Sequence, residues 1–365
     1  MSKLRFAIVG CGVIHGTHID AIKALSDDAE LVAVCDEVEE IARRAGEKNG
    51  VTHFTDLDAM LSGADFDVLC VCTPSGLHAE HGVRGAKAGK HVVCEKPIDV
   101  SLKAADALIA ACADNKVKLE VISQHRYSSG IRALRQYLDE GRLGDLCYGE
   151  STTKWYRTQE YYDSGGWRGT WALDGGGALM NQGVHYVDML RWIMGPVKAV
   201  SATMGTRAHE RIEVEDIVSA NIEFENGAVG TLLASTAMYP GFKQSLEVYG
   251  TNGTVVVENS RLKFAQFADN AGERTPGGVK NAPPPEVKDF VRQGQADGEA
   301  GQAQGASDPR AISVGGHVAH FTDLIEAIRT GRETFMNGTE ARSALELIVA
   351  VYESARTGKR VELPL

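Results

Sequence analysis

The first 36 residues predict one βαβ unit, and this unit constrains the fold more than any other segment. An apolar strand, Phe6 to Val9, precedes the tight turn Gly10-Cys11-Gly12 and a helix expected from about Val13 to Leu25. A second apolar strand, Leu31 to Val34, ends at Asp36. Glycines in such a turn let the backbone approach a pyrophosphate, whose charge the N–H groups at the helix start stabilise.

The turn lacks the third glycine of the G-x-G-x-x-G pattern, because His15 stands in its place. Asp36 supplies independent support for a dinucleotide, since a carboxylate at the end of the second strand can accept hydrogen bonds from ribose hydroxyls. Its charge, next to that of Glu37, repels a 2′-phosphate. We therefore expect NAD rather than NADP.

Two later strand ends carry polar residues. The strand expected over Asp67 to Cys72 leads into Thr73-Pro74-Ser75-Gly76-Leu77-His78, which suits close passage of a dinucleotide or is a plain strand-to-helix turn. The apolar run Val92 to Cys94 ends in Glu95-Lys96-Pro97. Because ligands bind beyond the carboxyl ends of parallel strands, Lys96 is a candidate proton carrier. The alternative is a solvated lysine at a strand end.

Composition excludes several classes of protein. The chain has 365 residues, 43% hydrophobic and 24% charged, which is typical of a globular protein with two domains. The net charge of −11 and the lack of any basic run longer than a pair argue against nucleic-acid binding. No apolar stretch approaches 18 residues and no signal peptide precedes Phe6, so we expect a cytoplasmic protein with no membrane partner.

The seven cysteines lie within the first 147 residues, most of them in apolar runs. We expect them to be reduced and buried. Cys70 and Cys72 have a spacing that fits neither a zinc site nor a redox pair, so no metal is expected.

From residue 123 onward, helical patterns alternate with long strands, and Asn226-Gly227 and Asn252-Gly253 are hairpin turn signals. The helices are expected over Ile131 to Glu140, Val184 to Met194, Phe321 to Thr330 and Thr339 to Arg356. The strands are expected over Leu146 to Tyr156, Ile217 to Phe224, Ala228 to Ser235 and Gln244 to Tyr249. Residues 269–313, rich in Gly, Pro, Ala and Gln, are expected to form a long loop or arm.

The predicted fold class is α/β. Residues 1–122 form an NAD-binding Rossmann domain with a doubly wound parallel sheet, and residues 123–365 form a substrate-binding and oligomerisation domain with a large, mostly antiparallel open sheet. A sheet with one uncovered face predicts a homodimer or homotetramer through that sheet.

The segment from Asp174 to Asp188 places a glycine run before a helix. On this helix Asn181, His185 and Asp188 share one face, where three polar groups rarely meet a dry core. A histidine side chain is able to titrate near neutral pH, so His185 is a candidate proton acceptor. Alternatively, these are packing residues with His185 hydrogen-bonded internally. Farther along, His317 is a residue that could reach the site from the loop before it, but we expect it to be a surface histidine.

Arg157 and Arg168 are interleaved with aromatic residues, namely Trp155, Tyr156, Trp167 and Trp171. Guanidinium groups bind a carboxylate, and aromatic faces stack on a pyranose, so this segment suits an anionic sugar. An equally weighted alternative is that the aromatics pack the domain interface and the arginines pair with acidic residues.

Three motifs together resemble the glucose-fructose oxidoreductase, inositol dehydrogenase and MocA family (Gfo/Idh/MocA), over nearly the whole chain. They are Gly10-x-Gly12 with His18, Thr73-Pro74-Ser75-x-x-His78, and Glu95-Lys96-Pro97. The resemblance implies a Rossmann domain that binds NAD or NADP, an open-sheet C-terminal domain, and Lys96 in contact with the substrate hydroxyl beside the nicotinamide. The bond before Pro97 is often cis in this family.

Members of this family commonly carry an Asp four residues before the catalytic His, and Asn181 stands there in this chain. An amide orients a substrate but cannot take a proton, which leaves proton transfer to Lys96 and His185. The match through 155–171 and Leu179-Met180-Asn181-Gln182 is most similar to the subgroup of UDP-N-acetylglucosaminuronate 3-dehydrogenase-like enzymes. The length and composition of 269–313 depart from that subgroup.

We therefore expect an NAD-dependent dehydrogenase that oxidises a secondary hydroxyl of a sugar, sugar acid or cyclitol by hydride transfer to nicotinamide. The alternatives are an NADP-dependent keto-sugar reductase, an NAD-retaining enzyme of redox-assisted elimination, and a non-catalytic Rossmann ligand-binding protein. The expected cofactor contacts are Gly10, Gly12, Val13, Ile14, Asp36, Thr73, Pro74, Ser75, His78, Glu95, Lys96 and Gln124. The expected substrate contacts are Lys96, Tyr156, Arg157, Trp167, Arg168, Asn181 and His185, of which Lys96, His185 and Asn181 are the catalytic candidates.

Overall fold

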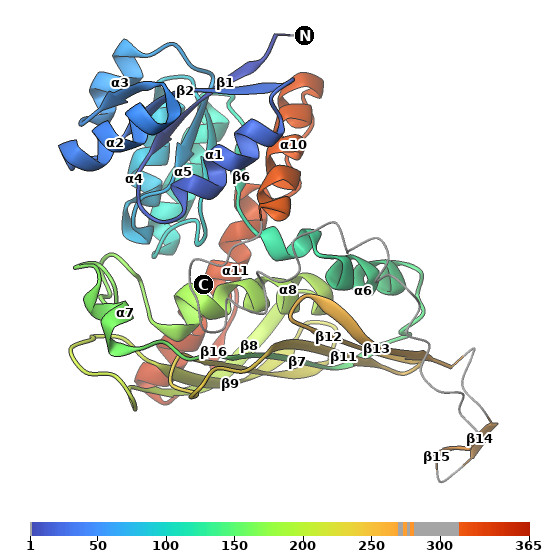
Figure 1. Cartoon of the computed structure of the whole chain (residues 1–365). Coiled ribbons are helices and arrows are strands. Elements are labelled where there is room, and N and C mark those ends of the chain that lie inside the picture. The colour runs from blue at the N-terminus through green and yellow to red at the C-terminus, as the bar shows by residue number, and fades with distance from the viewer. Residues whose placement is uncertain (1, 269–272, 276–277, 281–313) are drawn as a thin grey trace. The chain divides into compact units, whose positions relative to one another are not determined.

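The computed structural model describes residues 2–268, 273–275, 278–280 and 314–365 (Figure 1). The chain divides into two compact units. The first comprises Met1–Gln124, Gly165–Gly176 and Ile312–Leu345, and the second comprises His125–Ser164, Gly177–Ala311 and Glu346–Leu365. The first unit thus takes in two segments from later in the chain, whereas the domain boundary after residue 122 stays a prediction.

The first unit contains a six-stranded parallel sheet in the order β3-β2-β1-β4-β5-β6. The strands are β1 (Leu4–Val9), β2 (Ala29–Cys35), β3 (Thr52–Phe54), β4 (Val68–Val71), β5 (His91–Cys94) and β6 (Leu119–Val121). This order reverses between β1 and β4, where dinucleotides bind in doubly wound folds. The prediction of a Rossmann sheet is confirmed.

Helices cover this sheet. They are α1 (His15–Ala24), α2 (Glu39–Asn49), α3 (Leu57–Gly63), α4 (His78–Lys87), α5 (Leu102–Asp114), α10 (Gly315–Thr330) and the short η1 (Ser75–Leu77). Helix α10 comes from far along the chain and packs beside α1. There Phe321 stacks on Phe6 of β1 at 5.4 Å between ring centroids, so α10 is part of the Rossmann core.

The second unit contains an eight-stranded sheet in the order β13-β12-β11-β7-β10-β9-β8-β16. The strands are β7 (Leu146–Lys154), β8 (Val197–Gly205), β9 (Ile217–Phe224), β10 (Val229–Ser235), β11 (Gln244–Gly250), β12 (Gly253–Glu258), β13 (Arg261–Phe267) and β16 (Val361–Glu362). Every pair is antiparallel except β7 with β10. The prediction of a large, mostly antiparallel sheet is confirmed.

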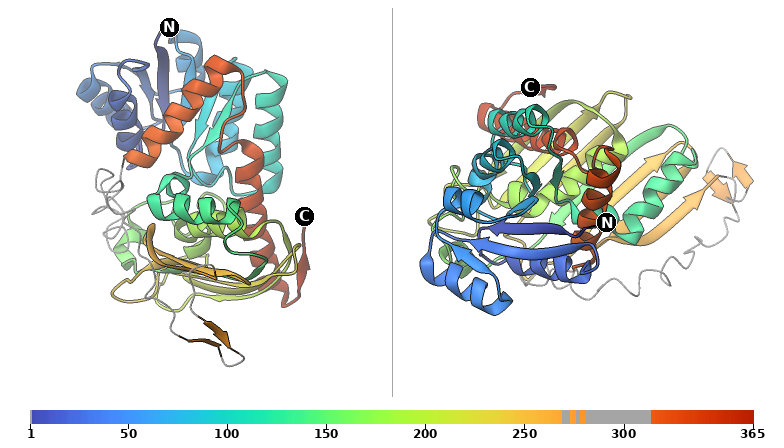
Figure 2. Two further views of the ribbon diagram at one scale, coloured as in Figure 1. Left: turned by 90° about the vertical axis from the view of Figure 1, so that its right-hand side faces the viewer. Right: turned by 90° about the horizontal axis from the view of Figure 1, so that it is seen from above.

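Helices α6 (Ser129–Asp139) and α8 (Val184–Met194) lie on one face of this sheet (Figure 2). Along β9, buried and exposed residues alternate, as expected for a sheet that packs on one side. Helix α11 (Gly338–Thr357) begins in the first unit and ends in the second.

Several boundaries differ from the sequence prediction. Helix α10 begins at Gly315, six residues before the expected Phe321, and buries His317 completely, so the expectation of a surface histidine is wrong. Within the predicted arm, Glu273–Thr275 (β14) pairs antiparallel with Gly278–Lys280 (β15), and the remainder of 269–313 lies outside the described residues. Across the part of the chain that the structure describes, no helix has the length and apolar character needed to span a membrane.

Candidate active site

The glycine-rich turn lies at the end of β1, beside the end of β4. Gly10 has a φ of +89°, and a Cβ there would lie 2.6 Å from the backbone carbon of Cys72, so only glycine fits. A Cβ on Gly12, by contrast, would meet no described atom within 4 Å. This open space at the start of α1 is what a close-lying pyrophosphate requires.

Asp36, directly after β2, is tied to this turn. Its Oδ2 accepts a hydrogen bond from the N–H of Cys11 at 2.8 Å, and its Oδ1 accepts one from the N–H of Val38 at 3.0 Å. The carboxylate is half-buried, so it retains accessible lone pairs. Turn and carboxylate together fit the pyrophosphate and ribose of a dinucleotide.

The loop after β4 is fixed by His78, whose ring contacts two carbonyl oxygens. Nδ1 lies 2.7 Å from the oxygen of Pro97, and Nε2 lies 2.9 Å from the oxygen of Thr73. Burial lowers the pKa of His78. The predicted residues Thr73, Pro74 and Ser75 thus stand next to the Glu95-Lys96-Pro97 motif, with Lys96 half-buried and its bond to Pro97 cis.

Glu95 is buried at the end of β5 and accepts hydrogen bonds from two histidines. His18 Nε2 lies 2.9 Å and His317 Nε2 lies 3.1 Å from Oε1, while the N–H of Lys96 donates to Oε2 at 3.2 Å. Burial acts to raise the pKa of Glu95, but the bonds from His18 and His317 outweigh it and hold the pKa well below its ordinary value. Glu95 therefore fixes the backbone of Lys96, and its role as a cofactor contact stays a prediction.

The contact of His317 with Glu95 joins residues 222 positions apart, which is why sequence patterns favour a surface histidine instead. His18, Glu95 and His317 place one ligand atom each within 4.8 Å of one another, a spacing that could also hold a metal ion. The prediction that the chain binds no metal is not tested by this geometry.

Trp167 and Arg168 belong to the segment Gly165–Gly176 of the first unit. The Arg168 guanidinium lies 4.5 Å from the ring centroid of Trp167. The segment is held on the loop after β4, where the N–H of Gly76 donates to the oxygen of Leu173 at 2.9 Å. Two predicted substrate contacts thus lie in the same unit as the predicted cofactor contacts. Val13, Ile14 and Gln124 also lie in that unit.

In the second unit, Asn181 and His185 come from a helix that changes its winding. Ala178–Gly183 (η3) is a π-helix, and α8 begins only at Val184. Asn181 lies in the π-helix and His185 in the α-helix, so the expected single α-helical face through these two residues is not formed. Such π segments are frequent at functional sites because they redirect side chains.

His185 is buried, with its ring 4.6 Å from that of His125, whose Nδ1 lies 2.8 Å from Ser260 Oγ. Asp188 makes a bidentate ion pair with buried Arg126 at 2.8 and 2.6 Å. Asp188 thus faces the interior with its charge compensated. The expectation that the polar face of this helix lies away from the core is therefore wrong for Asp188.

Glu215, which sequence reasoning missed, caps the π-helix. Its carboxylate accepts hydrogen bonds from the N–H groups of Gly177 and Leu179, both at 2.8 Å, and from the hydroxyl of Tyr352 at 3.0 Å. Burial raises the pKa of Glu215 to about 7. The segment that carries Asn181 is therefore anchored by one buried acid.

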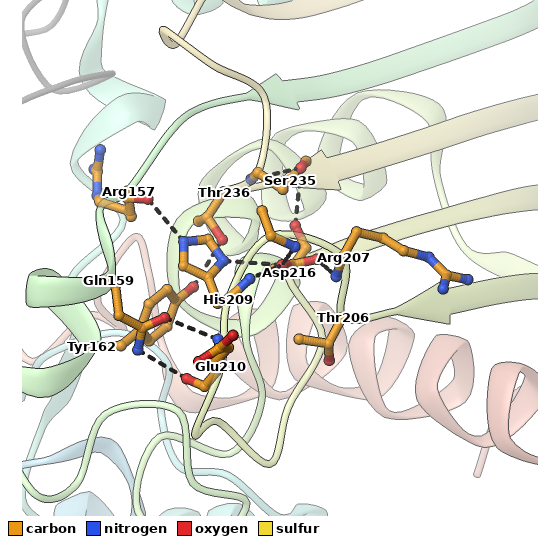
Figure 3. Close-up of polar contacts among 12 residues, drawn as sticks. Arg157, Gln159, Tyr162, Thr206, Arg207, His209, Glu210, Asp216, Ser235 and Thr236 are labelled. Atoms are coloured by element: carbon orange, nitrogen blue, oxygen red, sulfur yellow. Dashed lines mark hydrogen bonds and ion pairs between the residues drawn. The ribbon is translucent and has the colours of Figure 1, made fainter.

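Arg157 is buried after β7 and held by its backbone. Its N–H donates to the oxygen of Thr236 at 2.9 Å, and its own oxygen lies 2.8 Å from Nε2 of His209 (Figure 3). The guanidinium lies 4.9 Å from the ring centroid of Trp155 and donates to the oxygen of Tyr156 at 2.9 Å. Arg157 is thus placed on an aromatic face, and its role as a sugar-binding or a structural residue stays a prediction.

Comparison with known proteins gives matches in both halves of the chain. Residues 4–123 match the oxidoreductase family with an NAD-binding Rossmann fold, and residues 131–256 match the GFO/IDH/MocA C-terminal domain. The WlbA dehydrogenase from Bordetella pertussis, solved in complex with NADH and UDP-GlcNAcA, is 34% identical, with 100% of each chain covered and a TM-score of 0.85.

The chain belongs to the GFO/IDH/MocA oxidoreductase family. It is also 26% identical to inositol 2-dehydrogenase of Rhizobium meliloti over 99% of each chain. D-glucoside 3-dehydrogenase of Escherichia coli is 27% identical, with 99% of this chain and 98% of that protein covered. The predictions of the family, of NAD as cofactor and of an oxidoreductase acting on CH–OH groups are confirmed.

Proposed function

We propose that this oxidoreductase oxidises a secondary ring hydroxyl of an anionic sugar, of the class represented by UDP-N-acetylglucosaminuronate. The full-length similarity to WlbA, solved with NADH and UDP-GlcNAcA, carries this proposal. Arg157, placed on the Trp155 ring, and Arg168, placed on the Trp167 ring, support it as the groups that bind the carboxylate. Neutral sugars and cyclitols are the competing substrates.

The proposed chemistry divides the substrate's two hydrogens between cofactor and protein. Bound NAD supplies a nicotinamide ring that accepts the hydride from the carbon. Lys96, whose backbone N–H is fixed by Glu95, hydrogen-bonds the reacting hydroxyl and relays its proton, and His185 accepts that proton. The amide of Asn181 cannot take up a proton, so its role is to orient the substrate through hydrogen bonds.

NAD is proposed over NADP because of Asp36. The carboxylate stands at the end of β2, and it is tied to the glycine turn through Cys11. A 2′-phosphate would approach this negative charge, whereas ribose hydroxyls donate hydrogen bonds to it.

The test is NADH formation at 340 nm with NAD or NADP and a panel of UDP-sugar uronates, free uronates, aldoses and inositols. Activity confined to uronates supports the proposal, and activity confined to neutral polyols contradicts it. Lys96→Met should abolish turnover, whereas Lys87→Met, an exposed position in the last turn of α4, should not. Unchanged turnover in folded Lys96→Met would refute the assigned role of Lys96.

We also propose a homodimer or homotetramer formed through the eight-stranded sheet, since one face of β9 carries exposed residues. Light scattering after gel filtration gives the mass that decides this. The seven thiols, free in the structure and all buried except Cys147, support a reducing compartment, and we propose the cytoplasm.

A further inference from the structure

A buried histidine supports the segment that carries Arg157. His209 lies in the loop between β8 and β9, and both of its ring nitrogens face an acceptor (Figure 3). Nδ1 lies 2.9 Å from Oδ2 of Asp216, and Nε2 lies 2.8 Å from the oxygen of Arg157. A carboxylate and a carbonyl accept but do not donate, so both contacts are hydrogen bonds only when both ring nitrogens carry a proton.

We propose that His209, held as an imidazolium by Asp216, is a positioning residue for the substrate segment Trp155–Arg157. This inference rests on the proposed function, in which Arg157 binds the anionic group of the sugar. His209 does not touch the substrate and acts only through the carbonyl of Arg157.

The surroundings of His209 stabilise the charged ring. Asp216 is fully buried and also accepts hydrogen bonds from the N–H groups of Arg207 and Ala208, both at 2.8 Å. Burial acts to raise the pKa of Asp216, but the bond from His209 and these backbone bonds outweigh it, so the pKa lies below its ordinary value. A permanent negative charge therefore lies against the imidazole.

The described groups around the ring include an uncharged aromatic neighbour and two exposed charged side chains. Tyr162 of α7 (Gln159–Asp163) meets the ring edge-on at 4.7 Å between centroids, and its hydroxyl lies 2.8 Å from Oγ1 of Thr236. On the loop itself, Arg207 and Glu210 are exposed, and the Arg207 guanidinium points away from His209 (Figure 3).

His78 shows what the carboxylate contributes. The His78 ring lies between two carbonyl oxygens, no carboxylate among the described residues bonds it, and burial lowers its pKa. At His209 burial acts in the same direction, yet the bonds to Asp216 and to the Arg157 carbonyl outweigh it and raise the pKa. The charged form therefore persists to higher pH than in an ordinary histidine and is lost as the pH rises through this raised pKa.

The backbone of Arg157 is held at both its N–H and its carbonyl oxygen. Its N–H is held by the oxygen of Thr236, and its oxygen by the imidazolium. Deprotonation of His209 removes one of the two ring donors, leaving a nitrogen lone pair against an oxygen. Binding of the anionic sugar should therefore weaken at alkaline pH, while the NAD-binding residues of the first unit are unaffected.

The kinetic test compares His209→Phe with Tyr162→Phe, which removes one buried hydrogen bond from the same place and leaves the Arg157 carbonyl bonded. His209→Phe should raise the KM for the anionic sugar at least about tenfold and leave the KM for NAD unchanged. Tyr162→Phe should raise the sugar KM less than about threefold. In the wild type, the sugar KM should rise with alkaline pH, and His209→Phe should remove that dependence. Equal KM values, or the same pH profile, in wild type and His209→Phe would overturn the proposal.

A second measurement needs neither turnover nor substrate. In protein labelled with 15N-histidine, long-range 1H–15N correlation spectra at pH 7.5 should show an imidazole with both nitrogens protonated that is assigned to His209 by its absence from His209→Gln. A neutral ring at His209 would overturn the inference even for an active enzyme. If the imidazolium signal is present but the protein is inactive on all sugars tested, the assignment of a charged His209 stands and the proposed function is wrong.

Discussion

Replacing Glu215 by glutamine tests whether a buried acid controls the stability of the segment that carries Asn181. Glu215 is 2% exposed and accepts three hydrogen bonds through its two oxygens. Burial raises its pKa to about 7 from an ordinary value of 4.5. Between these two pH values the folded chain keeps a proton that the unfolded chain loses.

The sign of the effect follows from this raised pKa. The contribution of Glu215 to stability is fully present below pH 4.5 and is lost as the pH rises through about 7. Between pH 5 and pH 8 the loss amounts to about 2.5 kcal/mol. Glutamine does not titrate, so Glu215→Gln lacks this loss.

Glutamine also changes one hydrogen bond directly. Its amide oxygen can replace Oε1, which serves Leu179 and Tyr352, but its NH₂ group then faces the N–H of Gly177. Two facing donors cost about 1–3 kcal/mol. Glu215→Gln should therefore be less stable than the wild type at pH 5, and this deficit should shrink or reverse by pH 8.

The assay is urea unfolding at pH 5, 6, 7 and 8 for the wild type, Glu215→Gln and Glu213→Gln. Glu213 is an exposed acid two residues away and serves as the matched control. Its substitution should change the free energy of unfolding by less than about 0.5 kcal/mol at every pH. If the difference between wild type and Glu215→Gln is the same at pH 5 and pH 8, the burial argument for Glu215 is wrong.

Three further predictions concern the first unit. Gly12→Ala should raise the Kd for NAD at least about tenfold in calorimetry without lowering the melting temperature. Gly10→Ala should lower both the affinity for NAD and the melting temperature, because its Cβ would lie 2.6 Å from the backbone of Cys72 after β4. Asp36→Asn keeps an acceptor and removes the charge, so the preference for NAD over NADP, measured as a ratio of kcat/KM values, should fall at least about tenfold; an unchanged ratio would contradict the charge argument. Glu95→Gln should lower the free energy of unfolding at pH 7 by about 2–4 kcal/mol, since the amide oxygen in place of Oε1 lacks the charge that faces His18 and His317, and the NH₂ group in place of Oε2 faces the N–H of Lys96. Because the pKa of Glu95 lies well below its ordinary value of 4.5, this difference should narrow as the pH falls below 4.5, and a constant difference in urea titrations would refute it.

The Rossmann sheet was predictable because its signals are local. Apolar runs mark β1, β2, β4 and β5, and Gly10 and Asp36 mark the turn and the strand end within one unit of about 36 residues. The hairpin turns at Asn226-Gly227 and Asn252-Gly253 likewise join β9 to β10 and β11 to β12. Each of these features follows from the chemistry of a few adjacent residues.

The supports of the candidate site were not predictable in this way. His317 bonds Glu95 across 222 positions, and Glu215 caps Gly177 across 38. The π-helical winding of η3 cannot be predicted from residue spacing, because a pattern of i and i+4 residues assumes the 3.6 residues per turn of an α-helix. Sequence analysis places Asp188 on one polar helix face with Asn181 and His185, because it cannot show the partner Arg126, which lies 62 positions away.

Glu215 and Asp216 are neighbours in sequence but serve different loops, one holding the glycine segment before Asn181 and the other the loop of His209. This has a consequence for engineering by chimera. A transplant of residues 155–171 from a relative, made to change substrate range, would leave the carbonyl at position 157 resting on a His209–Asp216 pair selected for another loop. A graft that includes residues 205–217 would bring the matching support with it and should be the better starting point.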